Sequence, residues 1–167
     1  YSVLDKAELL HQITVNDSVQ ISETYSVHNG IYSGKVAYSS ISDPSSLMIH
    51  DLISDQAVEV GPGNLKVYSI AFSPNGRNAL LLATDLSCVP DCPSDVWLWQ
   101  DGQSDFRLVV ENAEWRYLSV AEVWSPDSNF AMALTAEFVP ILVEMDSGAI
   151  GPIESVPAAG YWQWEDN

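Results

Sequence analysis

The chain has 167 residues, 47% of them hydrophobic, so it is long enough to bury a core and too apolar for intrinsic disorder. Six lysines and arginines against 23 aspartates and glutamates give a net charge of −17. That charge repels nucleic acid and anionic lipid and makes both poor candidates as partners. No apolar run is long enough for membrane insertion. The chain opens on Tyr1 rather than on Met, which favours a processed or excised polypeptide.

Residues 1–18 have two interpretations. Lys6–Gln12 has the composition of a short helical turn, whereas Leu9–Val15 alternates like the outer strand of a preceding unit. We favour the strand, because Asn16-Asp17-Ser18 then makes its exit turn. The same tripeptide is a glycosylation sequon, which makes Asn16 a candidate glycosylation site in a eukaryotic secretory setting.

Residues 19–60 read as the first complete antiparallel unit, with strand-forming runs separated by turn residues. Its inner strand is expected over Val19–Val27, followed by a turn at His28-Asn29-Gly30. Three further strands are expected over Lys35–Ser39, Leu47–Asp51 and Ala57–Val60. The unit ends at Gly61-Pro62-Gly63, where the chain is broken before the next one.

Residues 67–110 form the clearest unit. The expected strands are Val67–Phe72, Asn78–Ala83, Asp95–Trp99 and Phe106–Val110. Ser73-Pro74-Asn75-Gly76 joins the first two, because proline presets φ and Asn-Gly accepts the remaining turn dihedrals. Asp101-Gly102 closes a second tight hairpin by the same chemistry.

Residues 118–154 repeat this pattern, and a repeated unit of this size indicates a repeat architecture. Leu118–Trp124 is followed by Ser125-Pro126-Asp127-Ser128, and the later strands are expected over Phe130–Thr135, Pro140–Met145 and Ile150–Ile153. Phe72 thus corresponds to Trp124, and Gly102 to Gly148. A further start appears at Gly160–Trp164 within residues 158–167.

These repeats resemble the TolB-type, WD-repeat-like β-propeller family. The hallmark of that family is an aromatic residue followed by Ser-Pro-Asp-Gly, an apolar strand, and an aromatic-containing strand that ends in Asp-Gly. The matching segments are Phe72–Gly76 with Val96–Gly102, and Trp124–Ser128 with Ile141–Gly148. The resemblance implies a fold and says little about function, because the shared residues build turns and core.

We therefore predict an all-β fold: a single β-propeller segment, residues 1–167, of four-stranded antiparallel blades. Blades are expected at about 19–60, 67–110 and 118–154, with partial blades at 1–18 and 158–167. Propellers use four to eight blades, so three are too few to close a ring. We expect an arc of a larger propeller, or one that a partner completes.

Cys88 and Cys92 lie four residues apart in an inserted loop, a spacing that can reach disulfide geometry. We favour a disulfide between them, with free thiols as the alternative. A zinc site would need a second Cys/His pair, and a redox motif would need Cys-x-x-Cys. A disulfide indicates an oxidising, extracytoplasmic location: periplasmic, cell-surface or secreted.

Chemistry-bearing residues are sparse. Asp85, Asp91 and Asp95 flank the cysteines and are weak calcium candidates, although their spacing is not that of an EF-hand. The histidines lie far apart, and no serine sits in a Gly-x-Ser-x-Gly elbow. We predict no catalytic residues, no metal and no cofactor.

Six tryptophans raise the question of a binding surface. Trp97, Trp99, Trp124 and Trp164 fall at strand positions where TolB-type blades place core aromatic residues. Trp115 and Trp162 lie nearer loops and are the better candidates for interaction, although packing is the more frequent use even there.

The function predicted is a non-catalytic propeller module for protein–protein interaction or assembly. Its partner would be another protein or further blades of the same polypeptide, in a homo- or hetero-oligomer. The alternatives are the propeller portion of a larger enzyme such as a peptidase, and a module that binds sugar or calcium.

Overall fold

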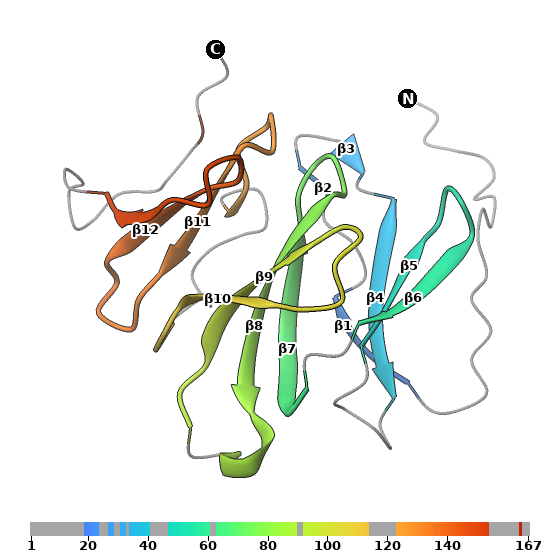
Figure 1. Cartoon of the computed structure of the whole chain (residues 1–167), viewed down its shortest axis with the longest axis horizontal. Coiled ribbons are helices and arrows are strands. Elements are labelled where there is room, and N and C mark those ends of the chain that lie inside the picture. Colours follow the sequence, from blue (N-terminus) through green and yellow to red (C-terminus); the bar gives the residue numbers. More distant parts are fainter. Residues whose placement is uncertain are drawn as a thin grey trace, which may run out of the picture.

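The computed structural model describes residues 19–23, 27–28, 31–32, 34–40, 47–60, 63–89, 92–113, 123–153 and 164. In this part the chain is all-β, and three antiparallel sheets of three or four strands follow one another side by side in chain order, with a separate two-stranded hairpin (Figure 1). They do not close into a ring. Across the described ranges no helix is long and apolar enough to cross a membrane. The predicted fold class, an open arc of propeller-like antiparallel sheets, is confirmed.

The first sheet has the order β1-β4-β5-β6. Its strands are β1 (Val19–Glu23), β4 (Lys35–Ser40), β5 (Leu47–Asp51) and β6 (Gln56–Val60). The inner strand is shorter than the expected Val19–Val27. Instead, β2 (Val27–His28) pairs with β3 (Ile31–Tyr32) in a hairpin of its own, which takes Val27 away from β4.

The middle sheet has the order β10-β9-β8-β7, with every strand paired to its neighbour in the chain. It comprises β7 (Leu65–Phe72), β8 (Asn78–Asp85), β9 (Asp95–Gln100) and β10 (Arg107–Val110). The run Ala79–Ala83 in β8 is apolar without alternation because this sheet is covered on both faces. A single 3-10 turn, η1 (Leu86–Cys88), follows β8.

The last sheet has the order β11-β12-β13: β11 (Phe130–Leu134), β12 (Pro140–Glu144) and β13 (Ile150–Pro152). The expected fourth strand, Leu118–Trp124, lies mostly outside the described residues. Its end is marked by the isolated antiparallel bridge between Trp124 and Ala131. The expected strands Leu9–Val15 and Gly160–Trp164 also lie outside the described part, apart from Trp164.

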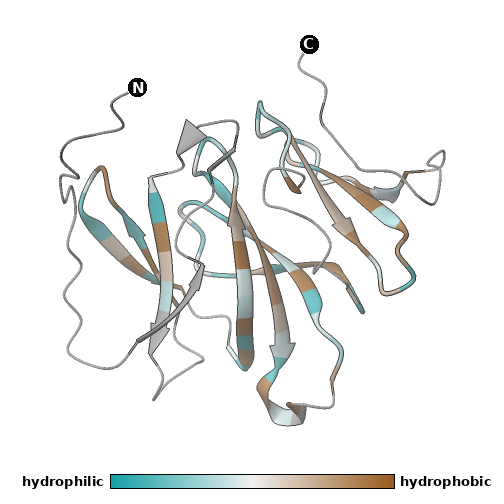
Figure 2. Ribbon diagram, turned by 180° about the vertical axis from the view of Figure 1, so that it is seen from behind, coloured by the Kyte–Doolittle hydropathy of each residue, from teal (hydrophilic) through white to brown (hydrophobic). Residues whose placement is uncertain are grey.

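Two hydrophobic clusters fill the spaces between neighbouring sheets, and apolar residues recur along the strands in Figure 2. The cluster toward the first sheet is built around Phe72, Leu81 and Trp99. The cluster toward the last sheet is built around Leu80, Leu98 and Trp124. Alternate residues of β9 thus serve opposite faces, as the two-residue period of a strand requires.

Candidate functional site

Two turns at one end of the sheets position the candidate site, and the first is Ser73–Arg77 between β7 and β8. The hydroxyl of buried Ser73 donates to Oδ1 of Asn75 at 2.8 Å, and it also accepts from the backbone N–H of Asn78 at 3.0 Å. Asn75 Oδ1 accepts a second bond from the N–H of Arg77 at 2.9 Å. Gly76 completes the turn at φ 68°, in the left-handed region.

The second turn, Ser125–Asn129, repeats this network before β11. Ser125 Oγ donates to Asp127 Oδ1 at 2.7 Å and accepts from the N–H of Phe130 at 2.9 Å. The N–H of Asn129 donates to Asp127 Oδ1 at 3.0 Å. The backbone N–H of Asn129 and then the hydroxyl of Ser125 lower the pKa of Asp127, because both bonds favour its charged form.

One hydrogen bond joins the two turns across the boundary between the middle and last sheets, and a second joins residues that lie just before them. The N–H of Asn75 donates to Oγ of Ser128 at 3.1 Å. The indole Nε1 of Trp124 donates to the carbonyl oxygen of Ala71 at 2.9 Å, in a buried setting. We call this boundary the seam. Ser128 occupies the position of Gly76 at φ 65°, so its side chain has a role there that glycine could not fill.

We expect Ser128→Ala to lower the free energy of unfolding by about 1 kcal/mol, because it loses the bond to Asn75 and keeps the left-handed backbone. Ser128→Gly loses the same bond but relieves about 1 kcal/mol of backbone strain, so its stability should stay near that of the parent. Urea denaturation of both variants checks that Ser128→Ala is the less stable of the two. A Ser128→Ala variant as stable as the parent would show that the hydroxyl of Ser128 does not bridge the sheets.

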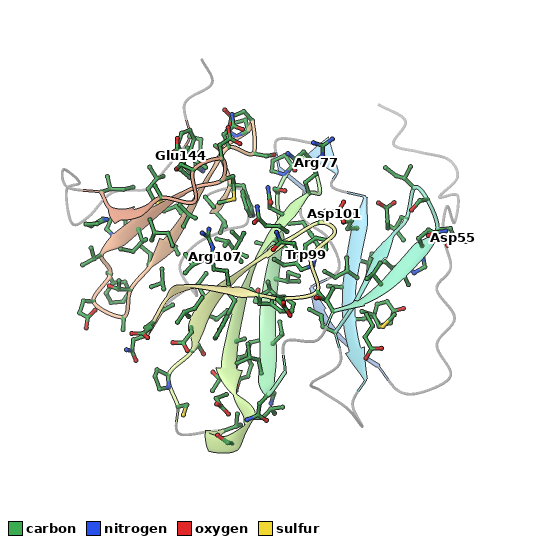
Figure 3. The ribbon with its side chains drawn as sticks, in the orientation of Figure 1. Asp55, Arg77, Trp99, Asp101, Arg107 and Glu144 are labelled. Atoms are coloured by element: carbon green, nitrogen blue, oxygen red, sulfur yellow. The ribbon has the colours of Figure 1, made fainter. Side chains whose placement is uncertain are left out.

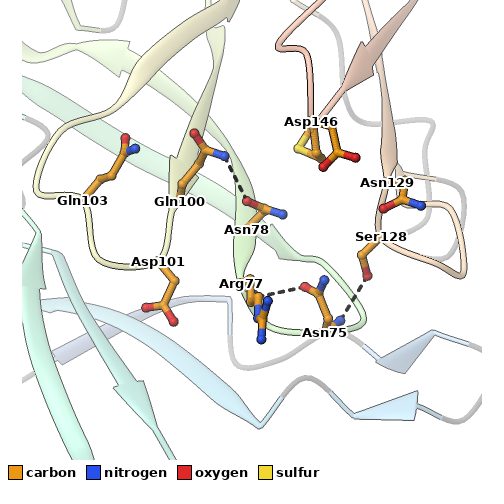
Figure 4. Close-up of a pocket in the computed structure, with 10 residues that line it drawn as sticks. Asn75, Arg77, Asn78, Gln100, Asp101, Gln103, Ser128, Asn129 and Asp146 are labelled. Carbon is orange, nitrogen blue, oxygen red and sulfur yellow. Dashed lines mark hydrogen bonds between the residues drawn. The ribbon is translucent and has the colours of Figure 1, made fainter.

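A pocket of about 370 Å³ opens on the seam at this end of the sheets (Figure 4). The middle sheet lines it from two turns with Asn75, Arg77, Asn78, Gln100, Asp101 and Gln103. The last sheet lines it with Ser128, Asn129, Met145 and Asp146. We call it the seam pocket. Figure 3 shows Arg77 and Asp101 at the same end of the middle sheet.

The polar groups of the seam pocket divide into those used internally and those left for a ligand. Asn78 is 9% exposed, and its Oδ1 accepts from Nε2 of Gln100 at 3.4 Å. Within the described part, the guanidinium of Arg77 has no carboxylate within 4.0 Å, and the carboxylates of Asp101 and Asp146 have no cationic partner. The pocket therefore combines charged and amide groups with a single apolar residue, Met145.

Two of the predicted calcium candidates, Asp85 and Asp95, accept hydrogen bonds from nearby loop residues. Asp85 Oδ1 accepts from the N–H of Ser87 at 2.7 Å and from Asn64 at 2.6 Å. Asp95 accepts from the N–H of Asn112 at 2.9 Å. Asp91 lies outside the described residues, and the described ones contain no group of three or more His, Cys, Asp or Glu side chains that could hold a metal.

The loop with the two cysteines is where the sequence predicts a disulfide bond. Cys92 is disulfide-bonded and partly buried, and Cys88 is the other cysteine of the chain, at the end of η1. We expect a Cys88–Cys92 bond, so the intact mass should rise by two hydrogens on reduction and neither thiol should be alkylated beforehand. Alkylation of both cysteines in the unreduced protein would contradict the pairing.

The remaining predicted residues fall into two groups. Trp97, Trp99 and Trp124 lie in the clusters between sheets, as expected for core aromatic residues. Trp115, Trp162 and Asn16 lie outside the described part, so their use in interaction or glycosylation stays a prediction. His50 pairs with Asp55 at 3.0 Å on the first sheet, far along the chain from the seam pocket.

Sequence reasoning did not find the seam pocket. Its residues come from four turns and the strand ends beside them, separated by up to about seventy positions, and each turn has an evident local use. The one available signal was the departure from the repeat at Ser128, where a second glycine would be expected.

No protein-family model and no curated protein matches the chain. Among solved structures it is similar to a protein assigned as TolB from Agrobacterium tumefaciens, at 18% identity and a TM-score of 0.48, over 84% of this chain and 47% of that one. It is also similar to TolB from Acinetobacter baumannii, at 12% identity and a TM-score of 0.48, over 84% of this chain and 33% of that one. A third similar structure is the β-propeller domain of the Trilobed protease from Pyrococcus furiosus, at 13% identity and a TM-score of 0.48, over 81% of this chain and 39% of that one.

The chain thus spans between a third and about half of the length of these structures. Identities this low carry nothing about activity or partners from one protein to another. The resemblance that the repeated Ser-Pro turns predict is found among the solved structures, and it is a likeness to TolB and β-propeller domains in fold alone.

Proposed function

We propose that this chain is a non-catalytic β-propeller module that acts in protein–protein recognition or assembly. The observation that carries this proposal is the outer face of the first sheet. Ala37, Leu47 and Ile49 are buried toward the middle sheet, and strand alternation turns their neighbours to the opposite face.

The outer face is partly apolar. Strand register places Tyr38 opposite Met48, and Val36 opposite His50, so these four side chains share the face. All four are intermediate in burial, with the side chain of His50 12% exposed, and none of them belongs to the described clusters that fill the spaces between sheets. In a propeller each blade packs on the next, so the proposed occupant is another blade-like sheet, from a second subunit or from more of the same polypeptide.

The seam pocket supports a non-catalytic role. Ser128 is the only hydroxyl in its lining, and its oxygen already accepts the N–H of Asn75. No histidine or cysteine lines the pocket beside it. A serine nucleophile needs a base within hydrogen-bond reach, and among the described residues the hydroxyl of Ser128 is not hydrogen-bonded to a histidine or a carboxylate.

We place the module outside the cytoplasm. The support is the disulfide bond of Cys92, because such bonds persist in oxidising compartments and are rare in the cytosol. The high net negative charge is compatible with an exposed extracytoplasmic surface and disfavours association with anionic lipid.

Light scattering of the 167-residue chain over a concentration series tests the assembly role. We expect association above the monomer mass, reduced by Met48→Lys on the outer face. The matched control is Val58→Lys, since Val58 pairs with Ile49 and shares the opposite face, yet is 57% exposed. A monomer at every concentration that melts cooperatively would contradict the proposal, as would equal effects of the two lysines.

A further inference from the structure

The seam pocket has a donor side whose orientation is fixed by bonds inside the protein. Asn75 Oδ1 accepts from Ser73 and from the N–H of Arg77, so the amide can only present its Nδ2 group outward. Asn78 Oδ1 accepts from Gln100, which fixes its amide in the same way. Among the described residues neither Nδ2 group has a hydrogen-bond partner. Together with the guanidinium of Arg77, they give the pocket three donor groups.

The acceptor side comes from both sheets. Asp101 reaches the pocket from the turn after β9, and Asp146 from the turn after β12. In Figure 4 the side chains of Asn78 and Asp146 are turned toward the space between the two sheets. Donors and carboxylate acceptors therefore border one cavity without being paired to each other, since no ion pair joins Arg77 to either aspartate.

This arrangement selects against simple ions. Two carboxylates and a net charge of −17 oppose an anion. The outward amide groups and Arg77 oppose a cation, because the guanidinium repels it and the amide oxygens of Asn75 and Asn78 already accept hydrogen bonds. A hydroxyl group satisfies both sides, since it accepts from an amide or guanidinium and donates to a carboxylate.

We propose that the seam pocket binds a neutral polyhydroxyl ligand, a sugar of one or two rings. The volume of about 370 Å³ lies at the small end of the range for ligand pockets and admits a molecule of that size. Met145 supplies the single apolar surface for the C–H face of a ring. This binding site is independent of the proposed assembly function, because the outer face lies on a different sheet.

The test uses the 167-residue chain labelled with ¹⁵N, titrated separately with glucose, galactose, maltose, glycine, arginine and phosphate. We expect saturable shifts of the Asn75 and Asn78 side-chain amide resonances with at least one saccharide. Arg77→Gln and Asp101→Ala should each weaken that binding about tenfold or more, the loss typical of a hydrogen bond to a charged group. Both residues are exposed, so the amide spectrum of each variant should otherwise be preserved.

Asp105→Ala is the matched control, an exposed aspartate in the same β9–β10 turn that does not line the pocket. It should bind the saccharide like the parent. The proposal is overturned if no saccharide gives saturable shifts, if only glycine, arginine or phosphate does, or if Asp105→Ala weakens binding as much as Asp101→Ala. Self-association in light scattering leaves these outcomes unchanged, so the two proposals fail separately.

Discussion

Replacing Trp124 by alanine is expected to lower the free energy of unfolding by about 3 to 5 kcal/mol. Trp124 is fully buried, packs in the cluster between the middle and last sheets, and donates to the carbonyl of Ala71 at 2.9 Å. The loss would take up much of the roughly 5 to 15 kcal/mol that stabilises a typical domain. Urea denaturation followed by tryptophan fluorescence measures it.

Two phenylalanine variants separate packing from hydrogen bonding. Trp124→Phe keeps most of the apolar contact and loses the donor, so it should cost about 1 to 2 kcal/mol. Trp97→Phe removes an indole nitrogen that is buried and has no hydrogen-bond partner in the described part, so stability should stay level or rise. If Trp97→Phe proves the costlier change, the bond from Trp124 to Ala71 does not hold the sheets together.

Asp51→Ala is expected to be the next most damaging change, at about 2 to 3 kcal/mol. The carboxylate of Asp51 accepts from the N–H groups of Ile53 and Ser54, each at 2.9 Å. It also bonds Nζ of Lys35 at 2.9 Å, and that side chain is only 10% exposed. The substitution removes two turn bonds and the counter-charge of a largely buried ammonium together.

The same bonds make stability depend on pH. The N–H of Ser54, then Lys35, hold the pKa of Asp51 well below its usual range, against a smaller opposing effect of burial. A carboxyl whose pKa is lowered on folding stabilises the fold above its unfolded pKa, near 3.9, and loses that contribution as pH falls further. We expect the midpoint of urea unfolding to fall between about pH 5 and pH 2, with a shallower fall in Asp51→Asn.

Asp105→Asn serves as the comparison, since Asp105 lies in an exposed turn. It should reproduce the pH profile of the parent. A parent whose unfolding midpoint is constant down to about pH 2, or an Asp51→Asn profile as steep as the parent's, would contradict the role given to this carboxylate.

The sequence predicted the middle sheet closely, because its turn chemistry and strand alternation agree. Ser73–Gly76 and Asp101-Gly102 accept only a few backbone conformations, and both strands beside each are apolar. The inner strand of the first sheet was predicted too long, since the run Val19–Val27 carries no residue that shows where pairing changes partner. The hairpin of Val27 with Tyr32 depends on tertiary context.

The seam pocket was beyond sequence reasoning for a different reason. Asn78 and Gln100 read as ordinary polar residues at strand ends, and their orientation follows from bonds to distant groups. The link from Asn75 to Ser128 spans 53 positions, which no local pattern encodes. Turn residues predict the bend of the chain, and the packing of one sheet on the next decides which turns meet.

The pairing order of the strands has a consequence for how the molecule opens. In the middle and last sheets each pairing joins consecutive strands, so a whole sheet can form through short loop closures before it docks. Backbone amides of one sheet should therefore exchange with deuterium together, as a group. How deeply each amide is buried should not by itself decide its exchange rate. The amides of β8 and β9, enclosed between neighbouring strands, should be the last to exchange. Those of β13, at an edge held by three pairs of residues, should exchange early.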